Sequence, residues 1–142
     1  MTTKDFNKLI TIPAGPFLMG SSEADRQALD NEKPQHEVSL PEFKIGKYPV
    51  INAQFEQFIE AGGYQEKRWW TEAGWAEKEN PRYEDEHRYE PLLWDNSIFN
   101  RPNQPVVGVS WYEALAYCRW LTTVWRSDGK IAPGRPAVKS QG

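Results

Sequence analysis

The sequence predicts a loop-rich α+β domain with one small, mainly antiparallel sheet and two short helices. First, 11 Pro and 10 Gly in 142 residues favour many turns over long regular elements. Second, seven Trp, six Tyr and six Phe can build an aromatic core although hydrophobic residues make up only 39% of the chain. Third, short segments with strand periodicity and segments with helical spacing both occur. The length suits one domain.

Three segments are expected to form the sheet. Residues 8–20 predict two short strands broken by a turn at 13–15, where Pro and Gly cluster. In residues 35–48, His36, Val38 and Leu40 alternate with polar residues, which predicts a half-buried strand followed by a second strand. Residues 104–109, apolar from Pro105 on, predict a buried strand. The polar segment 21–34 between the first two predicts a surface loop or a short solvated helix.

Two segments have helical spacing. The first, 52–61, ends at two consecutive glycines that stop the helix. The second, 111–125, begins after Ser110, which forms a capping box with Glu113. Its apolar face is predicted to run through Trp111, Leu115, Cys118 and Trp125. The residues expected to pack against the sheet are Phe55, Phe58, Leu115 and Cys118.

The segment 64–103 has no sustained periodicity and combines many charges with many aromatic residues. Such a long loop in a compact domain is usually functional, and its aromatic content argues against disorder. One interpretation is a contact surface for a ligand or partner, with Trp69, Trp70, Trp75 and Trp94 as the binding residues. The other is that these tryptophans cover the core.

Composition excludes some classes of partner. A net charge of −3 leaves no basic excess for binding nucleic acid. No segment has the length and apolarity of a membrane span or a signal peptide. The chain has one cysteine, so it forms no internal disulfide. These features favour a cytoplasmic protein.

Three stretches, in order, resemble the formylglycine-generating-enzyme (sulfatase-modifying factor) family. They are residues 12–21 (IPAGPFLMGS), 32–55 (EKPQHEV through IGKYPV to NAQF) and 103–121 (NQPVVGVSWYEALAYCRWL). The aromatic stretch 70–75 is similar to the bacterial branch. The resemblance implies a C-type-lectin-like fold and indicates that residues 1–131 are the N-terminal part of a family domain. Residues 132–142 depart from the family and predict a flexible tail.

Two departures from the family pattern bear on structure and function. Ile51 replaces a threonine that normally caps the first helix, at a cost of roughly 1 kcal/mol unless Asn52 caps instead. The resemblance also stops near residue 131, so the half of the domain that carries catalysis in family members is expected to be absent. A partner chain or a second copy would then cover the apolar face left by truncation.

The resemblance implies copper(I) chemistry at a pair of cysteines, and calcium sites, in complete family members. This chain has Cys118 alone, and we expect it to pack in the core. A related branch uses iron held by histidines. Here His36 is expected on a strand face and His87 in a solvated loop, with no metal role for either. We therefore expect no cofactor, and no catalysis by this chain alone.

Three functions remain open from the sequence. The first is a non-catalytic binding or accessory module of the family that uses the aromatic segment 64–103 for contact. The second is a fragment of a copper-dependent, cysteine-oxidising formylglycine-generating enzyme whose catalytic half lies outside this chain. The third is a degenerate product without activity. The identity of a small ligand or protein partner is not encoded in these patterns.

Overall fold

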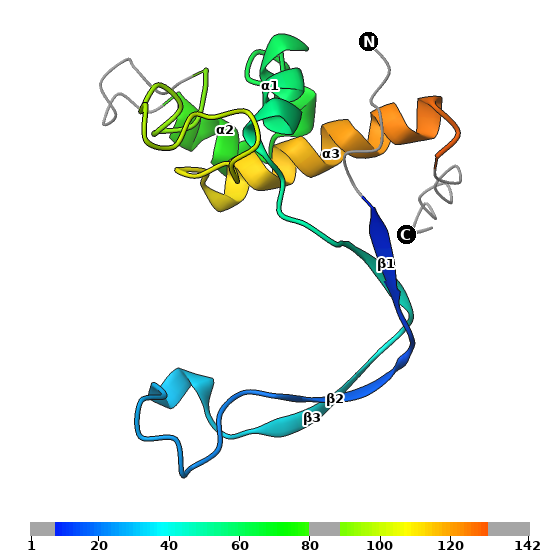
Figure 1. Cartoon of the computed structure of the whole chain (residues 1–142), viewed down its shortest axis with the longest axis vertical. Helices are drawn as coiled ribbons and strands as arrows, with labels where there is room; N and C mark the ends of the chain where they lie inside the picture. The colour runs from blue at the N-terminus through cyan, green and yellow to red at the C-terminus, as the bar shows by residue number, and fades with distance from the viewer. Residues whose placement is uncertain (1–7, 80–88, 131–142) are drawn as a thin grey trace, which may run out of the picture. The chain divides into compact units, whose positions relative to one another are not determined.

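A computed structural model describes residues 8–79 and 89–130 (Figure 1). The chain divides into two compact units, one up to Tyr48 and one from Pro49 onward. The tail predicted at 132–142 lies outside the described residues, and the domain boundary at residue 131 stays a prediction.

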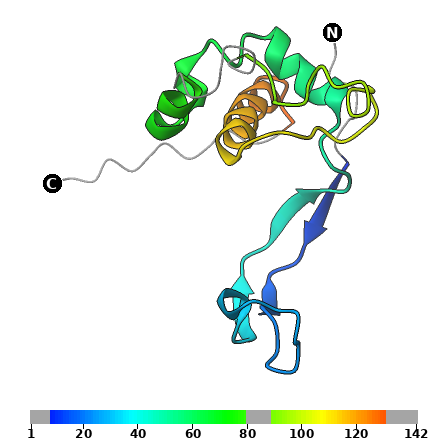
Figure 2. The ribbon, with the colours of Figure 1, turned by 90° about the vertical axis from the view of Figure 1, so that its left-hand side faces the viewer.

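The first unit is a two-stranded antiparallel ribbon, which Figures 1 and 2 show as two successive strand pairs. Strand β1 (Leu9–Ile12) pairs with β4 (Phe43–Gly46), and β2 (Gly15–Met19) pairs with β3 (His36–Leu40). The loop between β2 and β3 contains a short 3-10 helix, η1 (Asp30–Glu32). The predicted strands and the break between them are confirmed, but they form two small sheets instead of one.

Burial along the ribbon differs from the prediction. Val38 is half-buried, and the other four residues of β3 are exposed. The apolar strand residues Phe17 and Leu18 are 44% and 66% exposed. The strand predicted from the alternation is therefore confirmed, but the half-buried face predicted along it is wrong except at Val38.

The second unit is helical (Figure 2). It contains α1 (Asn52–Glu60), η2 (Lys67–Trp69), α2 (Glu72–Lys78) and α3 (Trp111–Ser127). The two predicted helices are confirmed, whereas η2 and α2 lie in the segment predicted to have no regular structure. Within the described residues, no helix has both the length and the apolarity that crossing a membrane requires.

Backbone carbonyls replace a capping side chain at the start of α1. Ile51 occupies the N-cap position and has no side-chain acceptor. The amides of Asn52 and Ala53 instead donate to the carbonyls of Gln104 (2.9 Å) and Pro102 (3.0 Å). The Asn52 side chain does not cap the helix, because its Nδ2 donates to the carbonyls of Phe99 (2.6 Å) and Arg101 (2.9 Å).

The prediction of a strand at 104–109 is wrong. The segment makes one isolated bridge, Ile51 with Pro105. The bridge is held by the Val106 amide, which donates to Val50 (3.0 Å), and by the Gln104 carbonyl, which accepts from Asn52 (2.9 Å), whereas the Gly108 carbonyl accepts from Leu92 (3.1 Å). A strand needs a continuous ladder with one neighbour, and these hydrogen bonds hold an extended connector instead.

The core of the second unit is aromatic. Phe55 stacks on Tyr117 with ring centroids 5.1 Å apart, and Phe58 contacts Trp120 at 5.6 Å. These contacts join α1 to α3 and give the small unit a large buried apolar area from few residues. The buried core consists of Phe55, Phe58, Tyr64, Trp69, Trp70, Ala116, Tyr117 and Trp120.

The predicted packing face of α3 is wrong. Trp111 is 68% exposed, Cys118 is exposed and Leu115 is only partly buried. The buried face instead contains Ala116, Tyr117 and Trp120. The predicted set and the buried set both recur at helical spacing, so periodicity alone does not distinguish them. The buried set is the one that faces α1. The C-type-lectin-like arrangement implied by the resemblance stays a prediction.

Candidate functional site

The second unit contains a pocket of about 300 Å³ between α2, the N-terminal turn of α3 and the loops beside them. Its walls combine aromatic rings, aliphatic side chains and ionisable groups, a mixture that is common in binding sites for small molecules. The lining residues are Tyr64, Trp70, Gly74, Glu77, Lys78, Leu92, Gly108, Val109, Ser110, Tyr112 and Glu113.

The capping box of α3 forms one wall of this pocket. As predicted, the Ser110 hydroxyl accepts from the Glu113 amide (3.3 Å) and Glu113 Oε2 accepts from the Ser110 amide (2.6 Å). The other carboxylate oxygen, Oε1, accepts from the Tyr64 hydroxyl at 2.6 Å. Burial and the Glu113 carboxylate raise the pKa of Tyr64 far above its ordinary value, so the phenol stays protonated and donates.

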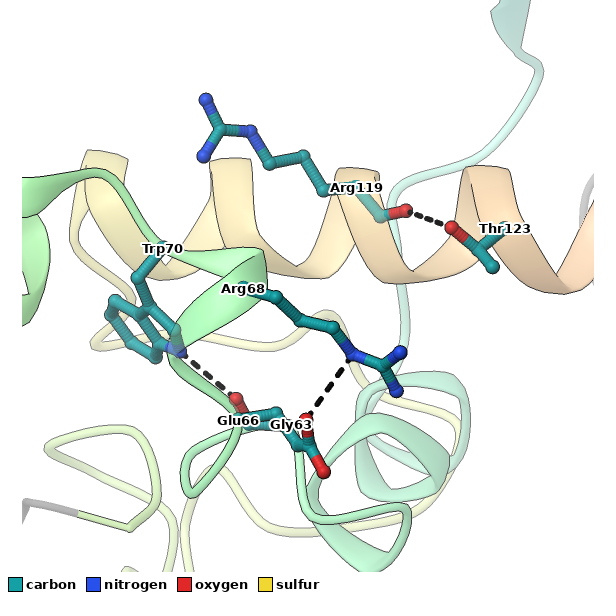
Figure 3. A network of polar contacts seen from close by, with 6 residues as sticks. All are labelled: Gly63, Glu66, Arg68, Trp70, Arg119 and Thr123. Carbon is teal, nitrogen blue, oxygen red and sulfur yellow. Dashed lines mark hydrogen bonds and ion pairs between the residues drawn. The ribbon is translucent and has the colours of Figure 1, made fainter.

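A close approach of α2 to α3 forms a second wall. Thr71 caps α2 by accepting from the Gly74 amide at 3.0 Å. A Cβ at Gly74 would lie 2.8 Å from Cβ of Tyr112, so only glycine permits this separation of the two helices. Trp70 is fixed beside them because its indole Nε1 donates to the Gly63 carbonyl at 2.9 Å (Figure 3).

Lys78 lies in an unusually covered position. Its side chain is 5% exposed, and its Nζ donates to Glu79 Oε1 at 2.5 Å. The ammonium also lies 4.2 Å from the centroid of the Trp75 ring and 5.6 Å from that of Tyr89. The carboxylate neutralises the charge of Lys78, and cation–π contacts stabilise it further.

The four predicted binding tryptophans lie on the core and do not form an exposed rim. Trp69 and Trp70 are 8% and 7% exposed, and Trp75 and Trp94 are half-buried against the same core. Arg68 lies over the Trp69 ring at 4.4 Å. It also forms an exposed ion pair with Glu66, which Figure 3 shows. Trp70 is the one of the four that lines the pocket. A role of these residues in binding stays a prediction.

The described residues do not group into a metal site. His36 lies on a strand, as predicted, with Nδ1 2.9 Å from the Pro34 carbonyl, and His87 lies outside the described residues. Among residues 8–79 and 89–130, no group of three or more His, Cys, Asp or Glu is placed to hold a metal. Cys118 does not line the pocket, and partial burial raises the pKa of its thiol. One cysteine does not fit a two-thiolate copper site.

Sequence reasoning missed most of the pocket. The capping box identified Ser110 and Glu113 as structural residues. Trp70 was proposed as a binding residue only because it is aromatic. The partnership of Tyr64 with Glu113 joins positions 49 residues apart, which no local pattern reports. Thr71, three residues before Gly74, was the one local sign of α2, and the helix of seven residues is too short for clear periodicity.

Comparison with known proteins identifies the family. Residues 1–126 match the sulfatase-modifying factor enzyme 1-like domain, so the chain belongs to the FGE-sulfatase family. It is 40% identical over 120 residues to a hercynine oxygenase of Mycolicibacterium thermoresistibile, covering 74% of this chain and 25% of that protein. It is 32% identical over 143 residues to the formylglycine-generating enzyme of Thermomonospora curvata, covering 79% and 43%.

A third relative is the inactive C-alpha-formylglycine-generating enzyme 2 of Bos taurus. It is 32% identical over 136 residues, covering 79% of this chain and 43% of the relative. The chain thus spans between a quarter and less than half of the length of these three relatives. The family resemblance predicted from the three sequence stretches is confirmed.

Proposed function

We propose that this chain serves as a non-catalytic binding module of the sulfatase-modifying-factor family and that the pocket beside α2 and α3 is its contact site. The observation that carries the proposal is the pocket itself. A volume of about 300 Å³ accommodates a small molecule or one large side chain. Trp70 and other residues of the aromatic segment 64–103 contribute to its walls.

Two anchored side chains prepare the pocket for binding. Trp70 is held by its hydrogen bond to Gly63, and Glu113 is held by donors from both Tyr64 and Ser110. Side chains that are already ordered lose little conformational entropy when a ligand arrives. The wall geometry therefore favours recognition of one ligand shape.

The proposal of a non-catalytic role rests on the donor set. Copper chemistry of the kind that the resemblance implies needs two thiolates, and this chain has Cys118 alone. None of the described residues that line the pocket is a cysteine or a histidine. One similar protein is itself named inactive, which supports a family role without catalysis.

A second candidate function is part of an oxidoreductase whose catalytic residues lie outside this chain. The coverage of the named enzymes, 25% of a hercynine oxygenase and 43% of a formylglycine-generating enzyme, favours it. Intact mass spectrometry of the product in its native cells separates the two candidates. A longer polypeptide that contains this sequence supports the enzyme part, and a polypeptide of these 142 residues supports the separate module.

Nuclear magnetic resonance tests the binding module. Benzylamine, benzamide and benzoate share a ring but differ in charge, and each is titrated into the full chain. The proposal expects at least one to shift the amides of Gly74 and Gly108 and the Trp70 indole signal saturably. Leu92→Trp, which fills the pocket, should abolish these shifts.

Ile98→Trp is the matched control, because Ile98 is 68% exposed in the same segment and does not line the pocket. Its titration should resemble that of the unmodified chain. If none of the three probes produces saturable shifts, or if both variants lose binding equally, the pocket is not the contact site and the proposal fails.

A further inference from the structure

Among the described residues that line the pocket, carboxylates outnumber cations. The ionisable ones are Glu77, Lys78, Glu113 and the phenol of Tyr64. The Tyr64 hydroxyl donates to Glu113 and carries no charge. The balance therefore depends on whether Lys78 compensates the two carboxylates.

Lys78 is already neutralised within its own helix turn. Its Nζ donates to Glu79, which does not line the pocket, and the rings of Trp75 and Tyr89 cover it. With 5% of its side chain exposed, it has little surface left for an anionic ligand. Lys78 therefore does not cancel the charge of Glu77 or Glu113.

Glu113 is held as a carboxylate inside the pocket wall. Two donors, the Tyr64 hydroxyl and the Ser110 amide, each bind one of its oxygens at 2.6 Å. Each carboxylate oxygen still has a second lone pair to accept a donor. Among the described residues, no lysine, arginine or histidine lies within ion-pair distance of Glu113 or Glu77.

The remaining walls also favour a cation. Tyr64, Trp70 and Tyr112 contribute aromatic rings, whose faces attract positive charge. Leu92 and Val109 contribute an apolar surface for a hydrocarbon stem. The opposite preference, an anion at the N-terminus of α3, is weakened because the amides of Ser110 and Glu113 are already bonded within the capping box.

We propose that the pocket binds an organic cation with N–H donors, an alkylammonium or alkylguanidinium group, between the carboxylates of Glu77 and Glu113 and the aromatic walls. The proposal rests on the pocket being the contact site of a binding module. The N–H groups of the ligand donate to the carboxylates, and its stem packs against the rings. The same chemistry is available from a free amine and from a lysine or arginine side chain of a peptide.

The test compares probes of matched size in the full chain by nuclear magnetic resonance. Benzylamine should bind more tightly than benzamide, and benzoate should bind least. Glu77→Gln should weaken benzylamine binding about two- to fivefold, as expected for loss of one partly solvated charge. Glu72→Gln is the control, since Glu72 is exposed on the same helix and does not line the pocket.

The outcomes separate this inference from the proposed function. If benzamide or benzoate binds as tightly as benzylamine or more tightly, with the shifts located at the pocket, the proposal of a cationic ligand is contradicted but that of a binding module is not. If Glu77→Gln and Glu72→Gln weaken benzylamine binding equally, the proposal of a cationic ligand is also contradicted. Absence of pocket shifts with all three probes overturns both proposals.

A second pair of probes distinguishes the two sources of the cation. Butylguanidine represents a free small molecule, and N-acetyl-arginine amide represents a side chain within a peptide. Both are expected to bind if the source is a peptide, since the pocket then accepts flanking amides. Binding of butylguanidine alone supports a free small molecule. Failure of both, while benzylamine binds, overturns the guanidinium half of the proposal.

Discussion

At the scale of single residues, Asn52 accounts for how α1 tolerates an isoleucine at its cap. Its side chain is 5% exposed and donates to the carbonyls of Phe99 and Arg101. These bonds hold the 99–104 loop in place, and the loop carbonyls then accept from the first amides of the helix. The cap that Ile51 lacks is thus supplied by a distant segment that Asn52 positions.

Asn52→Ala should therefore destabilise the chain by about 1–3 kcal/mol, because the Phe99 and Arg101 carbonyls lose a buried donor and the loop is released. Urea unfolding followed by circular dichroism measures this change. Asn100→Ala, at an exposed position of the same loop, should change stability by less than about 0.5 kcal/mol. Equal losses in the two variants would contradict the role given to Asn52.

Tyr64 predicts a pH dependence of stability. Its pKa in the folded chain is raised far above the ordinary value of 10.0 by burial and by Glu113. Below pH 10 the phenol is protonated in both the folded and the unfolded chain. Above pH 10 the unfolded phenol ionises while the folded one keeps its proton, so the free energy of unfolding falls as the pH rises. Burial also raises the pKa of Tyr117 to about 12. The contribution of Tyr117 to stability therefore also falls as the pH rises above 10.

Tyr64→Phe should lower stability at pH 8 by about 1.5–3 kcal/mol, because Glu113 loses a donor. It should also lose less stability than the unmodified chain between pH 9 and pH 11. Chemical denaturation at each pH gives both values. Tyr89→Phe is the control, because Tyr89 is 55% exposed, and its pH profile should follow that of the unmodified chain. Parallel profiles for Tyr64→Phe and the unmodified chain would refute the linkage.

At the scale of elements, the contact of α2 with α3 determines the shape of the pocket. The glycine at position 74 is buried in a helix, where alanine is normally preferred by about 1 kcal/mol. The Tyr112 side chain lies where a Cβ would be placed, so steric crowding outweighs helix propensity at this position.

Gly74→Ala should accordingly destabilise the chain by roughly 1–3 kcal/mol, as overpacking does. Ala73→Gly, at an exposed position of the same helix, should cost up to about 1 kcal/mol by propensity alone. Thermal unfolding compares the two. A stabilised Gly74→Ala variant would mean that α2 and α3 can separate without cost, and that their close approach does not shape the pocket.

Elements with a local signal were predicted correctly, and those decided by distant contacts were not. The capping box of Ser110 and Glu113 and the glycines after α1 located the helices, because their hydrogen bonds and dihedral preferences are local. The segment 104–109, apolar from Pro105 on, has the character of a strand, but it exchanges hydrogen bonds with Val50, Asn52 and Leu92. The packing face of α3 followed from the position of α1, and the pocket depends on pairs such as Tyr64 with Glu113. Neither is encoded in spacing.

At the scale of the whole molecule, the two units differ in how they are stabilised. The aromatic core belongs to the second unit, whereas apolar strand residues of the first unit, such as Leu18 and Ile45, are 66% and 52% exposed. A ribbon of two strands with little burial has marginal stability by itself. The two units should therefore open at different free energies.

Native-state hydrogen exchange measures this difference. Amides of the four strands should exchange at least about tenfold faster than those in the middle of α1 and α3, since local opening of the ribbon costs less free energy. All seven tryptophans lie at position 69 or later, so tryptophan fluorescence reports the second unit separately. Equal protection in both units would contradict separate opening.

A cationic ligand in the pocket beside α2 and α3 would lie against the aromatic rings that line it. Intermolecular nuclear Overhauser effects between benzylamine and the protein detect such contacts. The account predicts cross-peaks from the benzylamine methylene to the rings of Trp70 and Tyr112, and their loss in Leu92→Trp. Cross-peaks to the exposed Trp111, with none to the pocket rings, would place the contact elsewhere and contradict the account.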